Sequence, residues 1–510
     1  MEILAFVILI FFLFFTKLFL SKRGKSKNLP PSPPSLPLIG HLHLLKEPIH
    51  RTLHQMVAKY GDVLLLRFGA RNVVVVSSLS AATEEFFTKN DVALSNRPLS
   101  LAGKHLNYNH KTIGFSQYND HWRSLRRLTV LELLSNTRIA KFSGIRHEEA
   151  QIMVKTLLQE HRPSSSTDES CHSEWTKVEL RPKIVDLVFN IMMKMIAGKR
   201  YYGNEVVEEE ARQFQSIMRE LSELLENKNI NDIFPVLQWI DFQGVEKRMI
   251  TLKNKMDNFF QRLIDEHRKN GTGKAKSDAN DYERNMTFIE LILSLRESNP
   301  GAYDDETIKG LMLVGRCWLL GPTTTTITIE WAMSLLLNHP KAMHKARAEI
   351  EANVGHDRLV NESDLPNLSY LHNVINETWR LFPSIPVMPR ESADDCTISG
   401  FHIPKGTMML LNVWTIHRDE KVWENATSFI PERFERDGAE ANKLFMFGGG
   451  RRTCPGAFSA RRVVTLALAS LIQSFEWERI GQEAVTWLSN LDFTCLWSIP
   501  WRACANRTTP

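Results

Sequence analysis

The sequence predicts a mainly α fold with small β-sheets. The long segments with a clear period place apolar residues three and four positions apart, which is the spacing of a helix face. The segments rich in β-branched and apolar residues are short and are bounded by turn residues. The stretches 163–174 and 267–284 are polar and enriched in Ser, Asp, Asn and Gly, which is typical of exposed loops.

The helices are predicted from this spacing and from their stop signals. At 51–60 apolar side chains recur on one helical face, and Gly61 marks the end. A second helix begins at His121. Further helices are predicted at 307–337, at 342–354 after Pro340 and before Gly355, at 371–382, and at 463–475.

The strands are predicted at 63–68 and 73–77, which Gly69-Ala70-Arg71-Asn72 separates as in a hairpin. Two more β-type segments follow Pro389-Arg390, at 396–403 and 408–411. The stretch 89–120 is long and mixed, without a clear period. Long irregular segments in compact domains are usually functional or disordered.

Composition sets wide bounds. With 43% hydrophobic and 24% charged residues, the 510-residue chain is expected to be globular rather than disordered. A net charge of +5 is small for this length and permits, without requiring, an anionic partner or membrane surface. The six cysteines form no CxxC pair, which argues against a zinc site or a dithiol redox motif.

The N-terminus predicts an uncleaved membrane anchor at residues 1–21. Ile3 to Leu20 is almost entirely apolar and close to the ~20 residues that span a bilayer. The basic cluster that follows favours a cytoplasmic body. A cleaved secretory signal is the alternative, but it usually has a basic start and a small-residue cleavage site, and neither is evident. Residues 22–40 then form a basic and proline-rich hinge.

A cysteine near the C-terminal end carries the strongest chemical signal. Cys454 lies in Phe447-Gly448-Gly449-Gly450-Arg451-Arg452-Thr453-Cys454-Pro455-Gly456, directly before an apolar helix. Glycines let backbone bend tightly and approach a flat ligand. Backbone N–H groups and arginine charge are expected to hold the thiol as thiolate, the form that binds a metal. A buried cysteine in a glycine loop is the alternative, and the spacing Phe447-x-x-Gly450-x-Arg452-x-Cys454-x-Gly456 favours the metal ligand.

Two further patterns each place two polar or charged side chains about one helical turn apart. Trp122 and Arg126 share a helix face, and both side chains only donate hydrogen bonds. Glu377 and Arg380 are three residues apart, with Arg433 downstream in Pro431-Glu432-Arg433-Phe434. Taken alone, either pattern is most often packing or a surface ion pair worth ~0.2–0.5 kcal/mol.

Together, in this order, these motifs resemble those of the cytochrome P-450 monooxygenases, from the anchor to about Trp477. The resemblance implies a catalytic domain at 41–510 with haem b between the 307–337 helix and the cysteine loop. It implies Cys454 as the axial iron ligand, Phe447 and Arg452 as cofactor-binding loop residues, and a structural salt-bridge network of Glu377, Arg380 and Arg433. The residues that would hold the haem propionates are Trp122, Arg126 and Arg390.

The resemblance also implies an activity and a place in the cell. The activity is NADPH- and O₂-dependent oxidation of a small lipophilic substrate, with electrons from a membrane-bound NADPH–cytochrome reductase. The body would face the cytosol from the endoplasmic reticulum membrane, and no nucleic-acid partner is implied. Leu101 to Tyr108 looks like the matching stretch of plant isoflavone hydroxylases. A flavonoid-type plant phenolic is therefore the expected substrate class.

The chain departs from its relatives in the predicted long helix. Relatives typically read Ala-Gly-x-(Asp or Glu)-Thr, and this chain reads Leu320-Gly321-Pro322-Thr323-Thr324. The hydroxyl is kept as Thr324, the proton-relaying acid is replaced by Thr323, and Pro322 is expected to kink the helix at a cost of ~3 kcal/mol. Gly315-Arg316-Cys317-Trp318 and 485–491 are also unusual. Two readings stay open: a specialised oxygen-activation site, or a local reading-frame or splice error.

Three functions follow from this pattern. The first is the monooxygenase described above, with Thr323 and Thr324 at the catalytic position. The missing acid raises the alternative of a haem-thiolate isomerase that rearranges hydroperoxides without a reductase. A haem-binding relative without catalysis is the third. Product formation that needs NADPH and reductase separates the first from the others.

Overall fold

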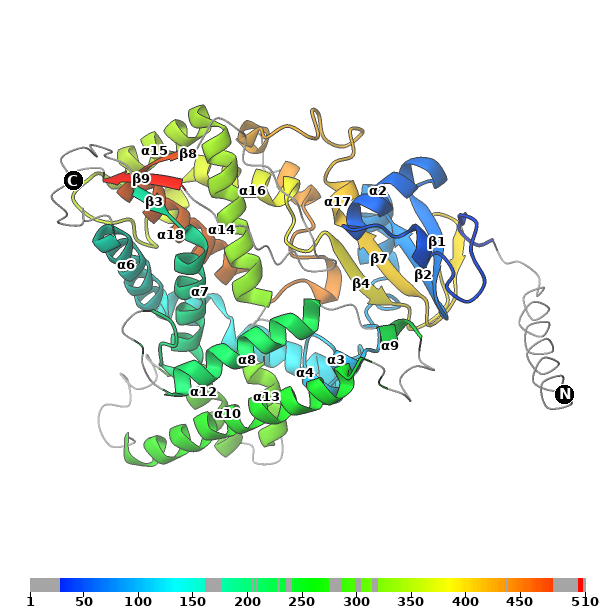
Figure 1. The fold of residues 1–510 in the computed structure, drawn as a ribbon, viewed down its shortest axis with the longest axis horizontal. Coiled ribbons are helices and arrows are strands. Elements are labelled where there is room, and N and C mark those ends of the chain that lie inside the picture. Colours follow the sequence, from blue (N-terminus) through cyan, green and yellow to red (C-terminus); the bar gives the residue numbers. More distant parts are fainter. Residues whose placement is uncertain are drawn as a thin grey trace, which may run out of the picture.

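Helices dominate the computed structural model, and a small sheet lies to one side of them (Figure 1). The structure describes residues 28–160, 176–203, 206, 209–226, 230–234, 241, 243–274, 286–298, 304–313, 320–435, 439–479 and 503–507. The predicted mainly α character with small sheets is confirmed for these residues.

A four-stranded sheet combines two strands from the N-terminal part of the chain with two strands from residues 387–412. Its strands are β1 (Val63–Phe68), β2 (Arg71–Val76), β7 (Met408–Asn412) and β4 (Val387–Glu391), in the order β1-β2-β7-β4. The predicted hairpin of β1 and β2 is confirmed. Its turn is shorter than predicted, because Phe68 pairs with Arg71 and leaves only Gly69 and Ala70 between them. Strand β7 runs parallel to β2 and antiparallel to β4.

Residues 28–40 of the predicted hinge lie against this sheet rather than forming a free linker. The Leu65 N–H donates to the Pro31 carbonyl at 2.8 Å, and Gly40 bridges to Phe68. A ring nitrogen of buried His41 lies 2.8 Å from the Pro33 carbonyl oxygen. Helix α2 (Ile49–Tyr60) follows and ends at Gly61, as predicted.

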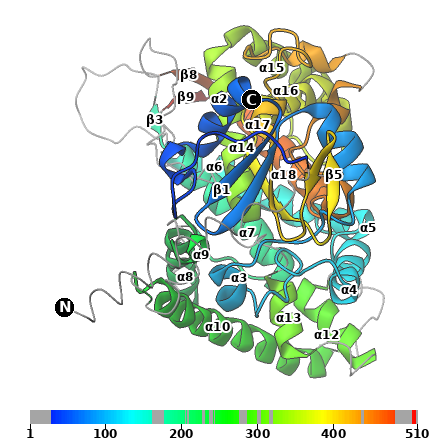
Figure 2. The same cartoon turned by 90° about the vertical axis from the view of Figure 1, so that its right-hand side faces the viewer.

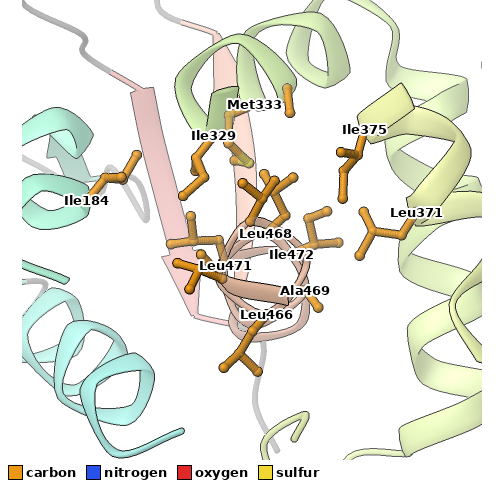
Figure 3. Close-up of a cluster of buried hydrophobic side chains, with 14 of the residues drawn as sticks. Ile184, Ile329, Met333, Leu371, Ile375, Leu466, Leu468, Ala469, Leu471 and Ile472 are labelled. Atoms are coloured by element: carbon orange, nitrogen blue, oxygen red, sulfur yellow. The ribbon is translucent and has the colours of Figure 1, made fainter. Parts of the chain in front are cut away.

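The main helical core surrounds α18 (Ala457–Ser474), the helix that follows the cysteine loop. Ten consecutive residues, Val463 to Ile472, are buried, so this part of the helix is covered on every side, and all but Thr465 and Ser470 are apolar. Figure 3 shows its Leu468 and Ile472 among side chains of α14 (Leu320–Asn338) and α16 (Ser369–Leu381). Fully burying one such side chain contributes ~1.5–3 kcal/mol.

The remaining elements complete the frame, and in both views α10, α12 and α13 lie at one end of the molecule (Figures 1 and 2). The helices are α3 (Leu101–Leu106), α4 (Asp120–Leu128), α5 (Asn136–Lys141), α6 (Ser143–Glu160), α7 (Leu180–Ala197), α8 (Glu209–Glu226), α9 (Ile230–Ile233), α10 (Val245–Lys274), α12 (Phe288–Ser298), α13 (Asp305–Met312), α15 (Pro340–Val354) and α17 (Val413–Ile416). The other strands are β3 (Thr176–Val178), β5 (Cys396–Ile398), β6 (Phe401–Ile403), β8 (Phe475–Arg479) and β9 (Ala503–Arg507).

Several expectations need correction or lie outside the described residues. The predicted helix 307–337 is described as α13 and α14, and 314–319 between them are outside the described residues. Helix α14 is described from Leu320 onward, and the residues directly before it lie outside the described part of the chain, so the kink predicted at Pro322 stays a prediction. The stretch 89–120 contains the short helix α3.

The predicted anchor, residues 1–21, lies outside the described residues, as does 485–491. Within the part of the chain that the structure describes, no helix is both long enough and apolar enough to cross a membrane.

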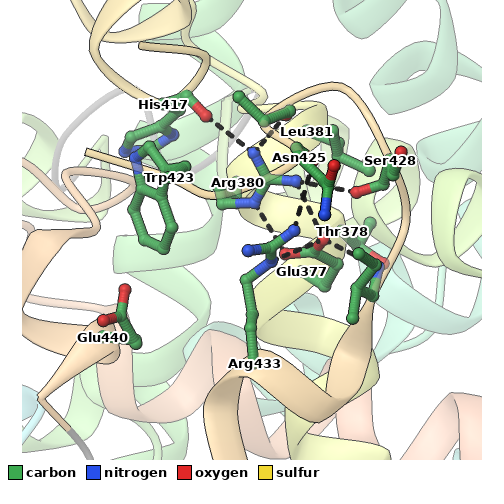
Figure 4. A network of polar contacts seen from close by, with 12 residues as sticks. Glu377, Thr378, Arg380, Leu381, His417, Trp423, Asn425, Ser428, Arg433 and Glu440 are labelled. Atoms are coloured by element: carbon green, nitrogen blue, oxygen red, sulfur yellow. Dashed lines mark hydrogen bonds and ion pairs between the residues drawn. The ribbon is translucent and has the colours of Figure 1, made fainter. Parts of the chain in front are cut away.

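The predicted network of Glu377, Arg380 and Arg433 is present (Figure 4). The fully buried Glu377 carboxylate accepts two hydrogen bonds from Arg380, at 2.7 and 2.8 Å, and one from Arg433 at 3.0 Å. Arg380 also donates to the carbonyls of His417, Ala426 and Ser428. The network therefore fixes α16 to the segment 417–433 that leads to the cysteine loop.

Replacing Glu377 by Gln is expected to lower the free energy of unfolding by ~3–5 kcal/mol, because two guanidinium groups lose their shared buried counter-charge. Denaturant unfolding measures the change. The matched control is Glu435→Gln, whose partner Lys345 and own side chain are about half exposed, and its cost should stay below ~1 kcal/mol. Equal effects of the two variants would contradict a structural role for the network.

Candidate haem-thiolate site

The loop that carries Cys454 is shaped by two left-handed glycines. Gly448 and Gly450 have φ values of 73° and 62°. A Cβ at Gly450 would lie 2.1 Å from an Asp91 carboxylate oxygen, so a side chain cannot replace this glycine without moving Asp91. The Cys454 N–H donates to the Phe447 carbonyl at 2.8 Å and closes the loop.

Asp91 holds the loop from the other side. Its carboxylate accepts from the Arg451 N–H at 3.1 Å and from the Arg451 guanidinium at 2.8 Å. The Arg451 Nε also donates to the Tyr118 hydroxyl at 2.9 Å. The backbone on which Cys454 sits is thus fixed by polar contacts to the segment that precedes α4.

The charge state of Cys454 differs from the sequence-based expectation. Burial is the largest influence and raises the pKa of its thiol, while the Gly456 backbone and the positive charge of Arg126 act in the opposite direction. The loop alone therefore favours the neutral thiol. A coordinating metal ion deprotonates a thiol outright, so the ion itself has to supply the missing stabilisation.

Four arginines gather around this loop. Burial and then the charges of Arg97 and Arg126 lower the pKa of Arg452 to about 9. Burial and then the charge of Arg452 lower the pKa of Arg390 to about 9. We call Arg97, Arg126, Arg390 and Arg452 the arginine cluster. Such mutual destabilisation of like charges calls for an anion among them.

The arginine cluster is incompletely neutralised by the protein. Among the described residues, no carboxylate forms an ion pair with Arg126, Arg390 or Arg452. Arg126 donates to the Thr453 carbonyl at 2.6 Å, and Arg452 donates to three backbone carbonyls, those of Ser95, Ile113 and Ser116. Asp91 acts on Arg390 by its charge but is already paired with Arg451.

Arg390 is the clearest member of the set. Arg390 lies in β4 and is 4% exposed. Its side chain makes no hydrogen bond to the described residues. Its nearest loop neighbour is Gly448, where an added Cβ would lie 3.9 Å from a guanidinium nitrogen. A buried cation without an acceptor is costly, and a ligand carboxylate would satisfy it. The residues present therefore fit a haem, which carries two propionates beside a flat ring.

Trp122 lies at the same place but uses its donor differently from the expectation. Its indole N–H donates to the Ile113 carbonyl at 3.1 Å, and the Arg452 guanidinium lies 4.3 Å from the centre of its ring. Both Trp122 and Arg452 thus bind the same carbonyl. Trp122 and Arg126 share a face of α4, as predicted, whereas Arg123 is exposed and pairs with Asp120.

Thr323 and Thr324 lie in the first part of the described helix α14. Thr323 is buried and Thr324 is partly buried. The Thr324 carbonyl accepts from the hydroxyls of Thr328, at 2.8 Å, and Ser384, at 3.2 Å. A contact chain through Trp379 links this turn to Phe447: the Trp379 ring meets the Phe447 ring edge-on at 5.0 Å.

Sequence reasoning missed Asp91, Arg97 and Tyr118 as parts of the site. All three lie in or beside the stretch 89–120, where no period pointed to a role. Arg97 donates to the Pro389 carbonyl at 2.7 Å and so reaches the backbone next to Arg390. A signal was available only in the charged residues of that irregular stretch, because their partners lie about 300 residues away in the chain.

Comparison with known proteins agrees with this geometry. A family model described as Cytochrome P450 matches residues 30–492. Cytochrome P450 81Q32 of Catharanthus roseus is 46% identical over 92% of this chain and 89% of its own length. Isoflavone 2'-hydroxylase of Glycyrrhiza echinata is 44% identical over 99% and 98%. The (+)-piperitol/(+)-sesamin synthase CYP81Q2 of Sesamum radiatum is 47% identical over 90% and 86%.

The family match covers both the cysteine loop and α14, and the relatives align over nearly their whole length. Their printed names include hydroxylases, which agrees with the resemblance to isoflavone hydroxylases in the sequence. The chain therefore belongs to the cytochrome P450 family and is a cytochrome P450 monooxygenase.

Proposed function

We propose that this monooxygenase hydroxylates, or otherwise oxidises, a small lipophilic plant metabolite of the flavonoid type. The observation that carries the proposal is the glycine-rich Cys454 loop beside the arginine cluster, a combination that fits a haem. Within the described part of the chain, Arg126, Arg390 and Arg452 of this cluster form no ion pair with a carboxylate. The substrate class is supported by relatives named isoflavone 2'-hydroxylase and isoflavone 3'-hydroxylase, 44% and 45% identical to this chain.

In this proposal Cys454 would bind the iron, and Phe447 and Gly448 would contact the ring. The arginine cluster and Trp122 would lie around the propionates. Bound haem supplies the iron at which dioxygen is activated for insertion of an oxygen atom into the substrate. The protein's part is to hold the ligand thiolate, to neutralise the propionates in a buried place and to deliver protons.

Proton delivery is assigned to Thr323 and Thr324. A partly buried carboxylate can exchange protons with solvent near neutral pH, whereas a threonine hydroxyl only passes on a hydrogen bond. With Thr323 in place of the acid, Thr324 and water have to perform the relay. The consequence is leaky turnover, in which NADPH is consumed without a matching amount of product.

We also propose that residues 1–21 anchor the chain in the endoplasmic reticulum membrane with a cytosolic body. The apolar run from Ile3 to Leu20 and the basic residues after it support this arrangement. Electrons would come from NADPH through a membrane-bound reductase. Arg123 and Arg127, exposed on α4 and turned away from Trp122, are available to such a partner.

Replacing Arg390 is expected to affect haem retention and the stability of the haem-free protein in opposite directions. Arg390→Leu should weaken haem retention ~10- to ~100-fold, the equivalent of losing a hydrogen bond to a charged group, worth ~1.5–3 kcal/mol. The same change should leave the haem-free protein as stable or more stable, since it removes a buried unpaired cation. Transfer of haem to an acceptor protein and denaturant unfolding measure the two effects. Arg123→Leu, on the exposed face of α4, should change neither.

The function is tested with microsomes that contain the full chain and a plant reductase. An isoflavone should be hydroxylated only when NADPH and the reductase are present, and activity should remain in carbonate-washed membranes. Cys454→Ala should abolish both the product and the red-shifted carbon monoxide spectrum of the reduced protein. Turnover of a lipid hydroperoxide without reductase, and no isoflavone product, would instead support the isomerase. A haem-loaded protein inactive in both assays would support the non-catalytic alternative.

Thr323→Asp is expected to raise the ratio of product formed to NADPH consumed severalfold, because it restores an acid beside Thr324. Thr324→Ala should lower that ratio. Both are measured in the same microsomes, with hydrogen peroxide release as the complementary quantity. An unchanged or lower ratio in a well-folded, haem-loaded Thr323→Asp protein would show that an acid is not what this site lacks.

A further inference from the structure

The side chain of Trp379 lies between the cysteine loop and the turn of α14 that carries Thr324. Trp379 comes from α16, two residues after Glu377, and is 2% exposed. On one side its ring meets Phe447 edge-on at 5.0 Å, with an interplanar angle of 77°. On the other side its indole N–H donates to the Thr328 hydroxyl at 3.2 Å.

The hydroxyl that Trp379 binds is itself directed at Thr324. Thr328 Oγ1 donates to the Thr324 carbonyl at 2.8 Å, one helical turn back. The Ser384 hydroxyl donates to the same carbonyl at 3.2 Å and lies 3.3 Å from Thr328 Oγ1. Thr328 and Ser384 are each 1% exposed. We call Trp379, Thr328 and Ser384 the Trp379 bridge.

The donor count fixes one hydrogen-bond role in the Trp379 bridge. An indole N–H can only donate, so Thr328 Oγ1 is its acceptor. The Thr328 proton can then point at the Thr324 carbonyl, and between the Thr328 and Ser384 hydroxyls either oxygen can be the donor. Back-bonding of a hydroxyl to the carbonyl four residues earlier competes with the helix ladder and bends a helix slightly. Here two hydroxyls converge on one carbonyl, so the local shape of α14 at Thr324 depends on them.

We propose that Trp379 is a positioning residue for the reaction: through Thr328 and Ser384 it sets the α14 turn at Thr324 relative to the cysteine loop. The ring contact with Phe447 fixes one end of this connection, and the paired hydroxyls fix the other. Trp379 itself is held by α16, which the Glu377 network ties down, and by Arg461, whose guanidinium lies 4.6 Å from its ring centre. This inference rests on the proposed role of Thr324.

The proposal separates two properties of Trp379. Trp379→Phe keeps a ring against Phe447 but removes the N–H, and Thr328→Val removes the hydroxyl at nearly constant volume. Each should lower the ratio of product to NADPH severalfold while the reduced carbon monoxide spectrum stays that of a thiolate. Thr328→Ser keeps the hydroxyl and should restore the ratio. Because both variants break one connection, the Trp379→Phe/Thr328→Val double variant should fall no further than the single ones.

A second readout does not need turnover. Backbone hydrogen exchange in the α14 segment around Thr324 and Thr328 should become on the order of fivefold faster in Trp379→Phe and in Thr328→Val, the effect of losing about one hydrogen bond. The matched control is Thr156→Val on α6. Thr156 is partly buried and makes the same kind of back-bond, to the Ile152 carbonyl at 2.9 Å, and it lies outside the Trp379 bridge. It should leave both the product ratio and exchange around Thr324 unchanged.

The outcomes distinguish this inference from the proposed function. If the parent protein gives no product with any isoflavone, the proposed function fails, and hydrogen exchange still decides whether the Trp379 bridge positions α14. If product forms normally and both variants leave the ratio and the exchange as in the parent protein, the bridge is ordinary packing and the inference is overturned. A loss in Thr156→Val equal to that in Thr328→Val would overturn it as well.

Discussion

The buried positive charge of the arginine cluster is the constraint on which the site depends. Arg390 and Arg452 are almost fully buried. Besides burial, the charge of Arg452 lowers the pKa of Arg390, and the charges of Arg97 and Arg126 lower that of Arg452. Carbonyl acceptors satisfy Arg452, but the side chain of Arg390 has no hydrogen-bond acceptor among the described residues. Such an arrangement costs folding free energy in the protein alone, and it becomes favourable when an anionic ligand enters. The site is therefore built for a dianionic cofactor before any substrate is considered.

Helix α16 contacts both the segment that leads into the cysteine loop and helix α14. Its Glu377 and Arg380 fix the segment 417–433, which leads into the cysteine loop. Its Trp379 reaches α14 through Thr328, and its Asn376 accepts from Arg461 of α18 at 3.0 Å. Residues that are adjacent in sequence thus face different neighbours around the helix. Helix α16 therefore connects the salt-bridge network to the turn of α14 that carries Thr324.

These contacts describe the surroundings of Thr323, the residue that stands where relatives carry an acid. Pro322 lies in α14, two residues before Thr324. The turn that follows is held by side-chain hydroxyls from Thr328 and Ser384 as well as by the helix itself. A relay built on hydroxyls and water requires their positions to be set accurately, since no carboxylate is present at Thr323 to exchange protons directly with solvent.

The sequence by itself determined the elements and the chemistry of isolated motifs. Periodicity and stop residues placed α2, α15 and α16 within two residues, because local spacing and glycine conformation decide where a helix lies and ends. Helix α18 was also predicted, but it begins at Ala457 rather than at Val463. The hairpin of β1 and β2 and the pairing of Glu377 with Arg380 are local for the same reason. The loop of Cys454 was recognisable because its glycines, arginine and cysteine lie within ten residues.

Only the tertiary structure decided what meets that loop. Asp91 and Arg97 come from a stretch without a period, and their partners lie about 300 residues away. The raised pKa of Cys454, the lack of an acceptor for Arg390 and the connection through Trp379 all depend on burial and on contacts between distant elements. Spacing along a chain cannot give these properties, because desolvation and hydrogen bonding are set by which surfaces pack together.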